Sequence, residues 1–328
     1  MGNPSPSGHY FNNAWRSVLC DNRPFDSPAD VRKCLRHKEV IFLGDSTIRQ
    51  WWEYLNSFVK GKAMWHLGGL LCVTRHRNPW ASTSRRRKRR CTFDRLEKER
   101  RMRDAIRSPP LLWVLLRAAP SRAGRLFHRA RAVGRSDCPG IHRHPSPPSS
   151  SELKLVDLGK NGRQDPRMAL DSENSILMSW HCHTYPLITS FFTHKEEMIN
   201  AAKRIDATVG GANTVIGICL GAHFTAFPLD VFRRRIGNIG AAVGRLLARS
   251  PRTKVVVKLA NTCTPGSLEI FNNWNTFRMN RITMEAFAGL KVAFVDAWDM
   301  TLSVGSRNIH PDRIVVKNEV DLFLSYVC

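Results

Sequence analysis

Ser46 stands where a buried strand is expected to give way to a helix, a position from which a serine hydroxyl can act as a nucleophile. Residues 39–43 contain a run of Val, Ile, Phe and Leu that is typical of a buried strand, and Gly44 and Asp45 end it. From Ile48 onward the apolar residues repeat with the spacing of one helical face. The hydroxyl therefore lies at the carboxyl end of a strand, where open α/β sheets bind ligands, and beside helix amides that can stabilise an oxyanion. Asp and Ser are also common helix N-caps, so this short motif alone leaves a purely structural role open.

A serine nucleophile needs a base, a partner that orients the base, and donors for the oxyanion. In an α/β fold these groups come from the loops that follow strands, and two further loops of this kind are expected here. The residues that suit the task are Gly221 and His223 in the first loop and Asp296, Asp299 and His310 in the second. Each also has an ordinary alternative, because a histidine can satisfy a loop carbonyl and an aspartate can cap the turn after its strand.

The rest of the chain supplies the elements that would position these residues. Apolar runs predict strands, and amphipathic stretches predict helices between them. The expected strands cover 39–43, 153–156, 175–180, 184–192, 214–220, 255–259 and 292–295. The expected helices cover 31–37, 48–55, 195–207, a long segment from Phe232 to Leu246, 275–288 and 315–326. Strands that alternate with helices in this way predict an α/β fold with a mostly parallel sheet.

The formal net charge of +24 is concentrated in one segment. Residues 75–143 hold 21 Lys and Arg against five acids, a net of +16, which leaves +8 for the remaining 259 residues. Six basic residues in a row, 85–90, are expected to be solvated and extended. No aromatic side chains alternate with them at base-stacking spacing, so we expect no nucleic acid as a partner.

This basic segment belongs to a longer insert that interrupts the globular pattern. Repeated Pro and Ser residues break every periodicity up to residue 151. We therefore divide the chain into 1–59, a first part with the serine motif; 60–151, a disordered basic insert; and 152–328, the remainder of the domain.

The cysteines and the hydropathy add further expectations. Nine cysteines contain no C-x-x-C pair, so a zinc ribbon is not expected; Cys20 and Cys34 flank a short loop and are candidates for a disulfide. His181 and His183 would share one strand face without an acidic third ligand, so we expect no metal site. No apolar run is long enough to span a bilayer, and the chain as given is not expected to carry a signal peptide.

Several motifs resemble one family. The string G-D-S-x-x-R-x-x-W-E-x-L, residues 44–55, resembles the first block of the PC-esterase branch of the SGNH hydrolases, which includes trichome-birefringence-like polysaccharide O-acetyltransferases. The segments P-S-G-x-Y-x-x-x-x-W at residues 6–15, D-A-W-D-M-T at 296–301 and N-x-x-D-x-F-L-S-Y-V-C at 318–328 resemble the neurexophilin and PC-esterase domain (NXPE) family. The resemblance covers 7–59 and 152–328, and it implies an SGNH-like three-layer fold.

The resemblance also implies roles for the residues named above. A histidine followed by proline resembles the SGNH block that delivers the base, which makes His310 the general base for Ser46. PC-esterases resemble this chain in having G-x-H after a central strand, so His223 and the Gly221 amide are expected to bind the oxyanion. Three residues before the base this chain has Arg307 where the SGNH pattern has Asp. The orienting carboxylate is therefore expected from Asp299, which fits the family pattern better, or from Asp296.

Arg49 and Glu53 are four residues apart on the expected helix after Ser46 and can pair on its surface. If Arg49 instead faces the nucleophile, its guanidinium suits an anionic substrate.

The function that the resemblance implies is a serine esterase or O-acetyltransferase acting on glycans, sialic acid among them, in the secretory pathway or outside the cell. A hydrolase of this type needs no cofactor, whereas a transferase needs an acyl donor such as acetyl-CoA. The alternative is a catalytically inactive binding module that recognises a glycan or acylated sugar without turning it over, an alternative that Arg307 favours.

Overall fold

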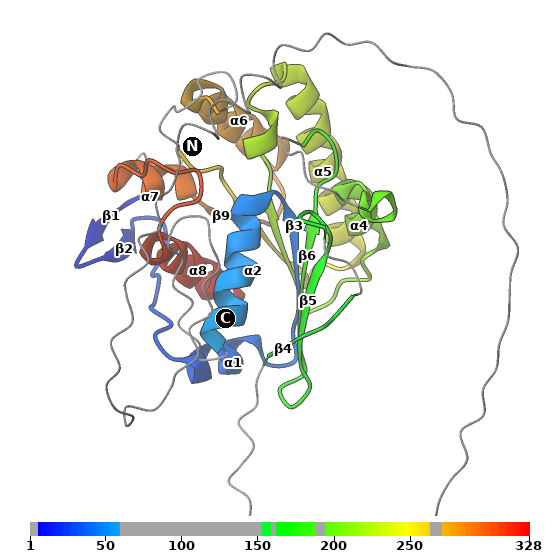
Figure 1. Ribbon diagram of the computed structural model, residues 1–328, viewed down its shortest axis with the longest axis vertical. Helices are drawn as coiled ribbons and strands as arrows, with labels where there is room; N and C mark the ends of the chain where they lie inside the picture. The colour runs from blue at the N-terminus through cyan, green and yellow to red at the C-terminus, as the bar shows by residue number, and fades with distance from the viewer. Residues whose placement is uncertain (1–5, 60–152, 159–161, 188–193, 263–270) are drawn as a thin grey trace, which may run out of the picture. The chain divides into compact units, whose positions relative to one another are not determined.

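The computed structural model describes residues 6–59, 153–158, 162–187, 194–262 and 271–328 (Figure 1). All of them lie in the compact unit formed by Met1–His66 and Pro147–Cys328. The expected insert at 60–151 lies outside the described residues.

A mixed sheet of seven strands forms the centre of the described fold, in the order β4-β5-β6-β3-β7-β8-β9. Its strands are β4 (Lys154–Leu155), β5 (Arg167–Asp171), β6 (Ile176–Cys182), β3 (Glu39–Gly44), β7 (Thr214–Cys219), β8 (Lys254–Lys258) and β9 (Ala293–Val295). From β6 to β9 neighbouring strands are parallel, whereas the β4–β5 and β5–β6 pairs of this sheet are antiparallel. The expected α/β class with a mostly parallel sheet is confirmed.

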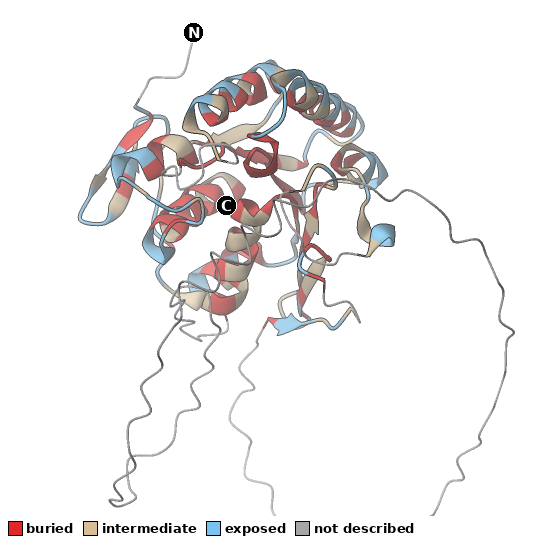
Figure 2. Ribbon diagram, turned by 45° about the horizontal axis from the view of Figure 1, so that its top comes forward, coloured by how far each residue is buried: buried red, intermediate tan, exposed pale blue. Residues whose placement is uncertain are grey.

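Helices cover both faces of the sheet. One face carries α1 (Pro28–Leu35), α2 (Ser46–Val59) and α8 (Arg313–Val327), and the other carries α4 (Ala201–Ala207), α5 (Leu229–Arg249) and α6 (Asn273–Ala286). Figure 1 shows α2 and α8 on one side of the sheet with α4 and α5 on the other, and Figure 2 shows buried residues in the strands and on the inner sides of the helices. Within the described residues no helix combines the length and the hydropathy needed to cross a membrane.

The central strands are apolar throughout because both of their faces are buried. In β3, Val40 and Phe42 point into the core beneath α2 and α8, whereas Leu43 belongs to the core beneath α5. Strand residues alternate between faces, so a strand covered on both sides reads as a continuous apolar run. This accounts for the success of the strand predictions at 39–43 and 214–220.

Some elements differ from the expectation. The strand predicted over 184–192 is irregular over 184–187, and the rest of it lies outside the described residues. The helix predicted over 195–207 is divided into η1 (Lys195–Glu197) and α4, because Asn200 caps α4 by accepting a hydrogen bond from the Ala202 amide. The hairpin of β1 (Gly8–Phe11) and β2 (Ala14–Ser17), strand β5 and helix α7 (Ala297–Ser303) were not predicted.

The disulfide candidate Cys20–Cys34 is wrong. Cys34, at the end of α1, is bonded to Cys328, which follows α8, and their Cα atoms are 5.5 Å apart. Cys20 is a free thiol whose Sγ lies 3.5 Å from the Tyr326 hydroxyl. Proximity along the chain suggested the wrong partner, because the fold brings α1 beside the end of α8.

We expect Cys328→Ser to lower the free energy of unfolding by about 2–5 kcal/mol under oxidising conditions, because the crosslink no longer restricts the unfolded chain. Denaturant unfolding of the oxidised protein measures this. Cys20→Ser is the matched control and is expected to change the free energy by less than about 1 kcal/mol. The reverse order of the two effects would contradict the assignment of the disulfide.

Candidate active site

The turn between β3 and α2 places the Ser46 hydroxyl at the carboxyl edge of the sheet. Gly44 has a φ of +151°, and a Cβ there would lie 1.8 Å from the Cys219 carbonyl oxygen of β7. Only glycine therefore allows β3 to end so close to β7. The Asp45 amide donates to that same Cys219 carbonyl at 3.2 Å, and Ser46 follows as the first residue of α2, half-buried.

Asp45 is a fully buried carboxylate that joins two of the loops at this edge. One carboxylate oxygen accepts from the Thr47 amide at 2.9 Å and the Thr47 hydroxyl at 2.7 Å. The other accepts from the Ala222 amide at 3.1 Å, in the loop after β7. Burial alone would raise the pKa of the Asp45 carboxyl, but the neighbouring imidazoles of His223 and His183 and the hydrogen bonds from Thr47 hold that pKa below its usual range.

His310 lies in the loop between α7 and α8, and its Nε2 atom is 2.6 Å from the Ser46 Oγ atom. The two residues are 264 positions apart in the chain. His310 is exposed as a whole residue, yet the protein packed around its ring and then the charge of Arg49 lower the pKa of the imidazole from 6.5 to about 4, although Asp45 opposes the shift. The ring is therefore neutral at pH 7 and can accept a proton from the serine, as a general base must.

Two backbone amides are available to an oxyanion. Ser46 is the first residue of α2, and Gly221 directly precedes the short helix η2 (Ala222–Phe224). Within the described part of the chain neither amide donates a hydrogen bond. The bond from the Ala222 amide to Asp45 holds the Gly221 loop beside the serine turn.

His223 is buried in η2, and its ring meets that of His183 edge-on with centroids 5.2 Å apart. Burial lowers the pKa of the His223 imidazole, and a hydrogen bond with the Pro186 backbone partly offsets this. The ring is thus neutral and has one N–H group. Because the ring also bonds to Pro186, its expected role as an oxyanion donor stays a prediction.

Arg49 both pairs with Glu53 on the surface of α2 and lies close to Ser46 and His310, so both arrangements expected for it occur together. Its Nε atom pairs with a Glu53 carboxylate oxygen at 3.1 Å, and one terminal nitrogen donates to the Arg163 carbonyl at 3.3 Å. Its guanidinium also lies 5.1 Å from the centre of the Trp180 ring. Its charge acts on the His310 imidazole, which places Arg49 at the rim of the site.

The two aspartates after β9 make different contacts: Asp299 binds the start of the chain, and Asp296 caps α7. The Asp299 carboxylate accepts from the Ser7 amide at 2.7 Å, and Asp296 caps α7 by accepting from the Asp299 amide at 3.1 Å. Burial and the nearby Asp299 raise the pKa of Asp296 to about 6. Among the described residues neither carboxylate hydrogen-bonds to His310, so an orienting role for Asp299 or Asp296 stays a prediction without a contact to support it.

Sequence reasoning missed a buried polar group behind the site. Lys258, Asn261 and Glu319 are almost fully buried, and the Lys258 ammonium contacts both of the others. A lysine in a strand covered on both faces was a usable signal, because such strands are otherwise apolar.

The three-layer fold and the serine at its strand-end turn fit the PC-esterase, SGNH-like type that the sequence resembles. The model for the C-terminal domain of NXPE family member 4-like proteins matches residues 15–78 and 148–328. The chain therefore belongs to the NXPE family. The match is interrupted between residues 78 and 148, within the region expected to hold an insert.

The lowered pKa of His310 predicts an unusual pH dependence for any ester turnover. The neutral ring is the active form, so kcat/KM should stay constant well below pH 6.5 and fall only as the pH drops through about 4. Removing the Arg49 charge removes one cause of the lowered pKa, so Arg49→Met should move this acid limb upward. A profile of kcat/KM against pH for both proteins measures this. An acid limb at 6.5 in the unaltered protein would contradict the assignment.

Proposed function

We propose that this chain is a serine acyl enzyme, an esterase or O-acetyltransferase that acts on glycans in the secretory pathway. The observation that carries the proposal is the 2.6 Å contact between Ser46 Oγ and a His310 ring whose lowered pKa keeps it neutral. A serine and a neutral imidazole at this distance form the nucleophile and base of acyl transfer.

The reaction follows from these positions. Ser46 Oγ attacks the ester carbonyl carbon while His310 Nε2 accepts its proton, and the resulting oxyanion receives hydrogen bonds from the amides of Ser46 and Gly221. As the tetrahedral intermediate collapses, the bond to the alcohol breaks and His310 returns the proton to the departing oxygen. Ser46 then carries the acyl group.

The second half of the reaction decides between hydrolase and transferase. In an esterase His310 takes a proton from water, and in a transferase from a sugar hydroxyl, as that oxygen attacks the acyl carbon. The bond to Ser46 Oγ then breaks, and His310 returns the proton to this oxygen. In a transferase the first ester or thioester is the acyl donor, for example acetyl-CoA.

An exposed aromatic surface supports a glycan as the substrate. On α6, Trp274 and Phe277 are 67% and 40% exposed, and the Phe277 ring lies 5.8 Å from that of Trp298 on α7. Aromatic faces give the apolar side of a sugar ring a large contact area. Arg278 and Arg281 are exposed on the same face of α6, and their guanidinium groups suit a carboxylate such as that of sialic acid.

This surface belongs to the same edge of the sheet as the serine. Helix α6 follows β8 and α7 follows β9, and the parallel strands β3, β7, β8 and β9 all end at this edge. The Asn275 side chain of α6 donates to the Thr225 carbonyl at 3.1 Å, just after the loop that carries His223. A glycan chain bound on the aromatic rings would therefore lie on the side of the domain that carries Ser46.

The Cys34–Cys328 disulfide supports the secretory pathway as the location, because such bonds form and persist in oxidising compartments.

One observation favours the second candidate function, a glycan-binding module without turnover. Among the described residues His310 has no carboxylate partner, and Arg307 stands where the related pattern has Asp. Such a module would bind an O-acetylated glycan equally well with Ser46 or alanine at this position and release no acetate.

We expect Ser46→Ala and His310→Ala each to lower acetate release from an O-acetylated sialoside by about 10³-fold or more, because the two residues act as one unit. The double variant should be no worse than either single variant. Ser325→Ala and His9→Ala are the matched controls, since both residues lie away from the site, and they should retain the full rate. Retained turnover in Ser46→Ala would contradict the proposal.

A further inference from the structure

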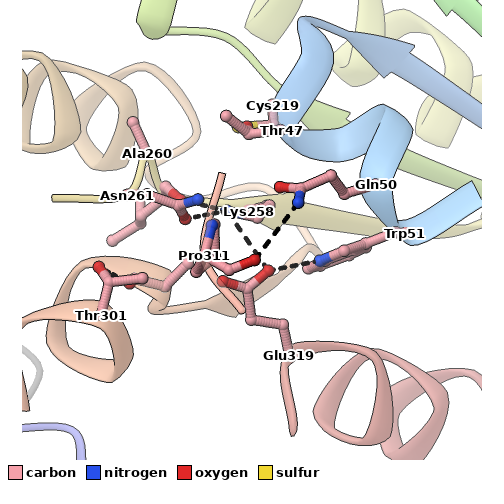
Figure 3. Close-up of polar contacts among 12 residues, drawn as sticks. Thr47, Gln50, Trp51, Cys219, Lys258, Ala260, Asn261, Thr301, Pro311 and Glu319 are labelled. Carbon is pink, nitrogen blue, oxygen red and sulfur yellow. Dashed lines mark hydrogen bonds and ion pairs between the residues drawn. The ribbon is translucent and has the colours of Figure 1, made fainter. Parts of the chain in front are cut away.

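A buried ion pair between Lys258 and Glu319 lies near Trp51, Asn261 and Pro311 (Figure 3). Lys258, the last residue of β8, and Glu319 of α8 are each about 1% exposed, and their charged atoms are 3.6 Å apart. The same Glu319 oxygen accepts from the Trp51 ring nitrogen, on the helix of the nucleophile, at 2.6 Å. Removing two charges from water carries a desolvation cost that exposed ion pairs largely lack. A buried pair is therefore weak evidence that its role is to stabilise the fold.

The ion pair continues toward the base through Asn261. The Lys258 ammonium donates to the Asn261 side-chain oxygen and, at 3.4 Å, to the Leu259 carbonyl. An ammonium group can only donate hydrogen bonds, so the oxygen of the Asn261 side-chain amide must face it. The amide nitrogen then faces away and donates to the Ile309 carbonyl at 3.0 Å, in the peptide bond that leads into His310.

Contacts on the other side of His310 complete this support. Gln50, on the helix of Ser46, has its side-chain nitrogen 3.5 Å from the Pro311 carbonyl (Figure 3). The His310 amide itself donates to the Asn308 side chain at 3.0 Å. The backbone is therefore bound before, at and after the histidine.

We propose that Asn261, fixed by the Lys258–Glu319 pair, is a positioning residue that holds the His310 loop in register with Ser46. In this arrangement the base is oriented through its backbone, where related triads orient the ring through a carboxylate. The catalytic meaning of this inference rests on the proposed function, but the positioning itself is a property of the loop.

Asn261→Asp separates the two contacts of this side chain. It keeps an oxygen for Lys258 and replaces the donor that faces Ile309 with a second oxygen, which repels the carbonyl. We expect amide hydrogen exchange in residues 305–312 to become several-fold faster, and the pKa of His310, followed by NMR, to rise from about 4 toward 6.5 as the ring leaves its surroundings. We also expect kcat to fall by about 10- to 100-fold with KM little changed.

Asn318→Asp is the matched control. Asn318 is equally buried, and its side-chain nitrogen donates to the Asn13 and Ile314 carbonyls, neither of which belongs to residues 305–312. Its replacement should cost stability without changing exchange in 305–312 or the pKa of His310.

Lys258→Met combined with Glu319→Leu tests the support behind Asn261 without leaving an unpaired buried charge. This double variant is expected to fold and to speed exchange in the same loop by a smaller factor.

Loop exchange and a His310 pKa that match the unaltered protein in both Asn261→Asp and the double variant would overturn the inference. Absence of ester turnover in the unaltered protein would instead contradict the proposed function. The exchange and pKa measurements need no turnover, so the two failures are distinguishable.

Discussion

Trp51 connects the helix of the nucleophile to the helix that follows the base. Its ring packs against Phe42 of β3 and Phe323 of α8, with centroids 6.3 Å and 5.3 Å away, and its nitrogen donates to Glu319. These contacts fix α2 against α8, and α8 begins directly after His310 and Pro311. The short distance between Ser46 and His310 is therefore a consequence of packing among large buried side chains, which tolerate little displacement.

This packing explains how a serine and a histidine can be paired without a carboxylate on the ring. The family pattern makes Asp296 and Asp299 candidates for that carboxylate, but Asp299 instead binds the Ser7 amide and holds the start of the chain against α7, and Asp296 caps α7. The base is instead held through backbone contacts that originate in buried side chains. An arginine in place of the usual aspartate at position 307 is compatible with this arrangement, because the side chain of Arg307 is exposed.

Much of the sheet could be predicted because buried parallel strands are continuous apolar runs. The β1–β2 hairpin escaped because its strands are short and mixed, although Asn12 and Asn13, with φ values of 49° and 60°, form a hairpin turn that asparagine pairs favour. The disulfide partner of Cys34 lies 294 residues away, and spacing carries no information over that distance.

The sequence also predicted part of the candidate site, but it did not reveal the contacts that depend on how distant elements pack. The motif at the end of β3 and the His-Pro motif before α8 led us to expect Ser46 and His310 in one site, and the structure places their side chains in contact. Motifs could not show that Asp299 turns toward Ser7, because that depends on how the first residues pack. Lys258 was visible as a charge within an apolar strand, but its partner Glu319 comes from a separate helix and only the fold reveals the pair.

A crystal structure of the protein after reaction with a fluorophosphonate tests directly whether Ser46 is the nucleophile. We predict a covalent bond between phosphorus and Ser46 Oγ, with the phosphonyl oxygen roughly 2.7–3.1 Å from the amides of Ser46 and Gly221 and the His310 ring still beside the serine oxygen. An unmodified Ser46, or an adduct whose oxygen points away from both amides, would contradict the proposal.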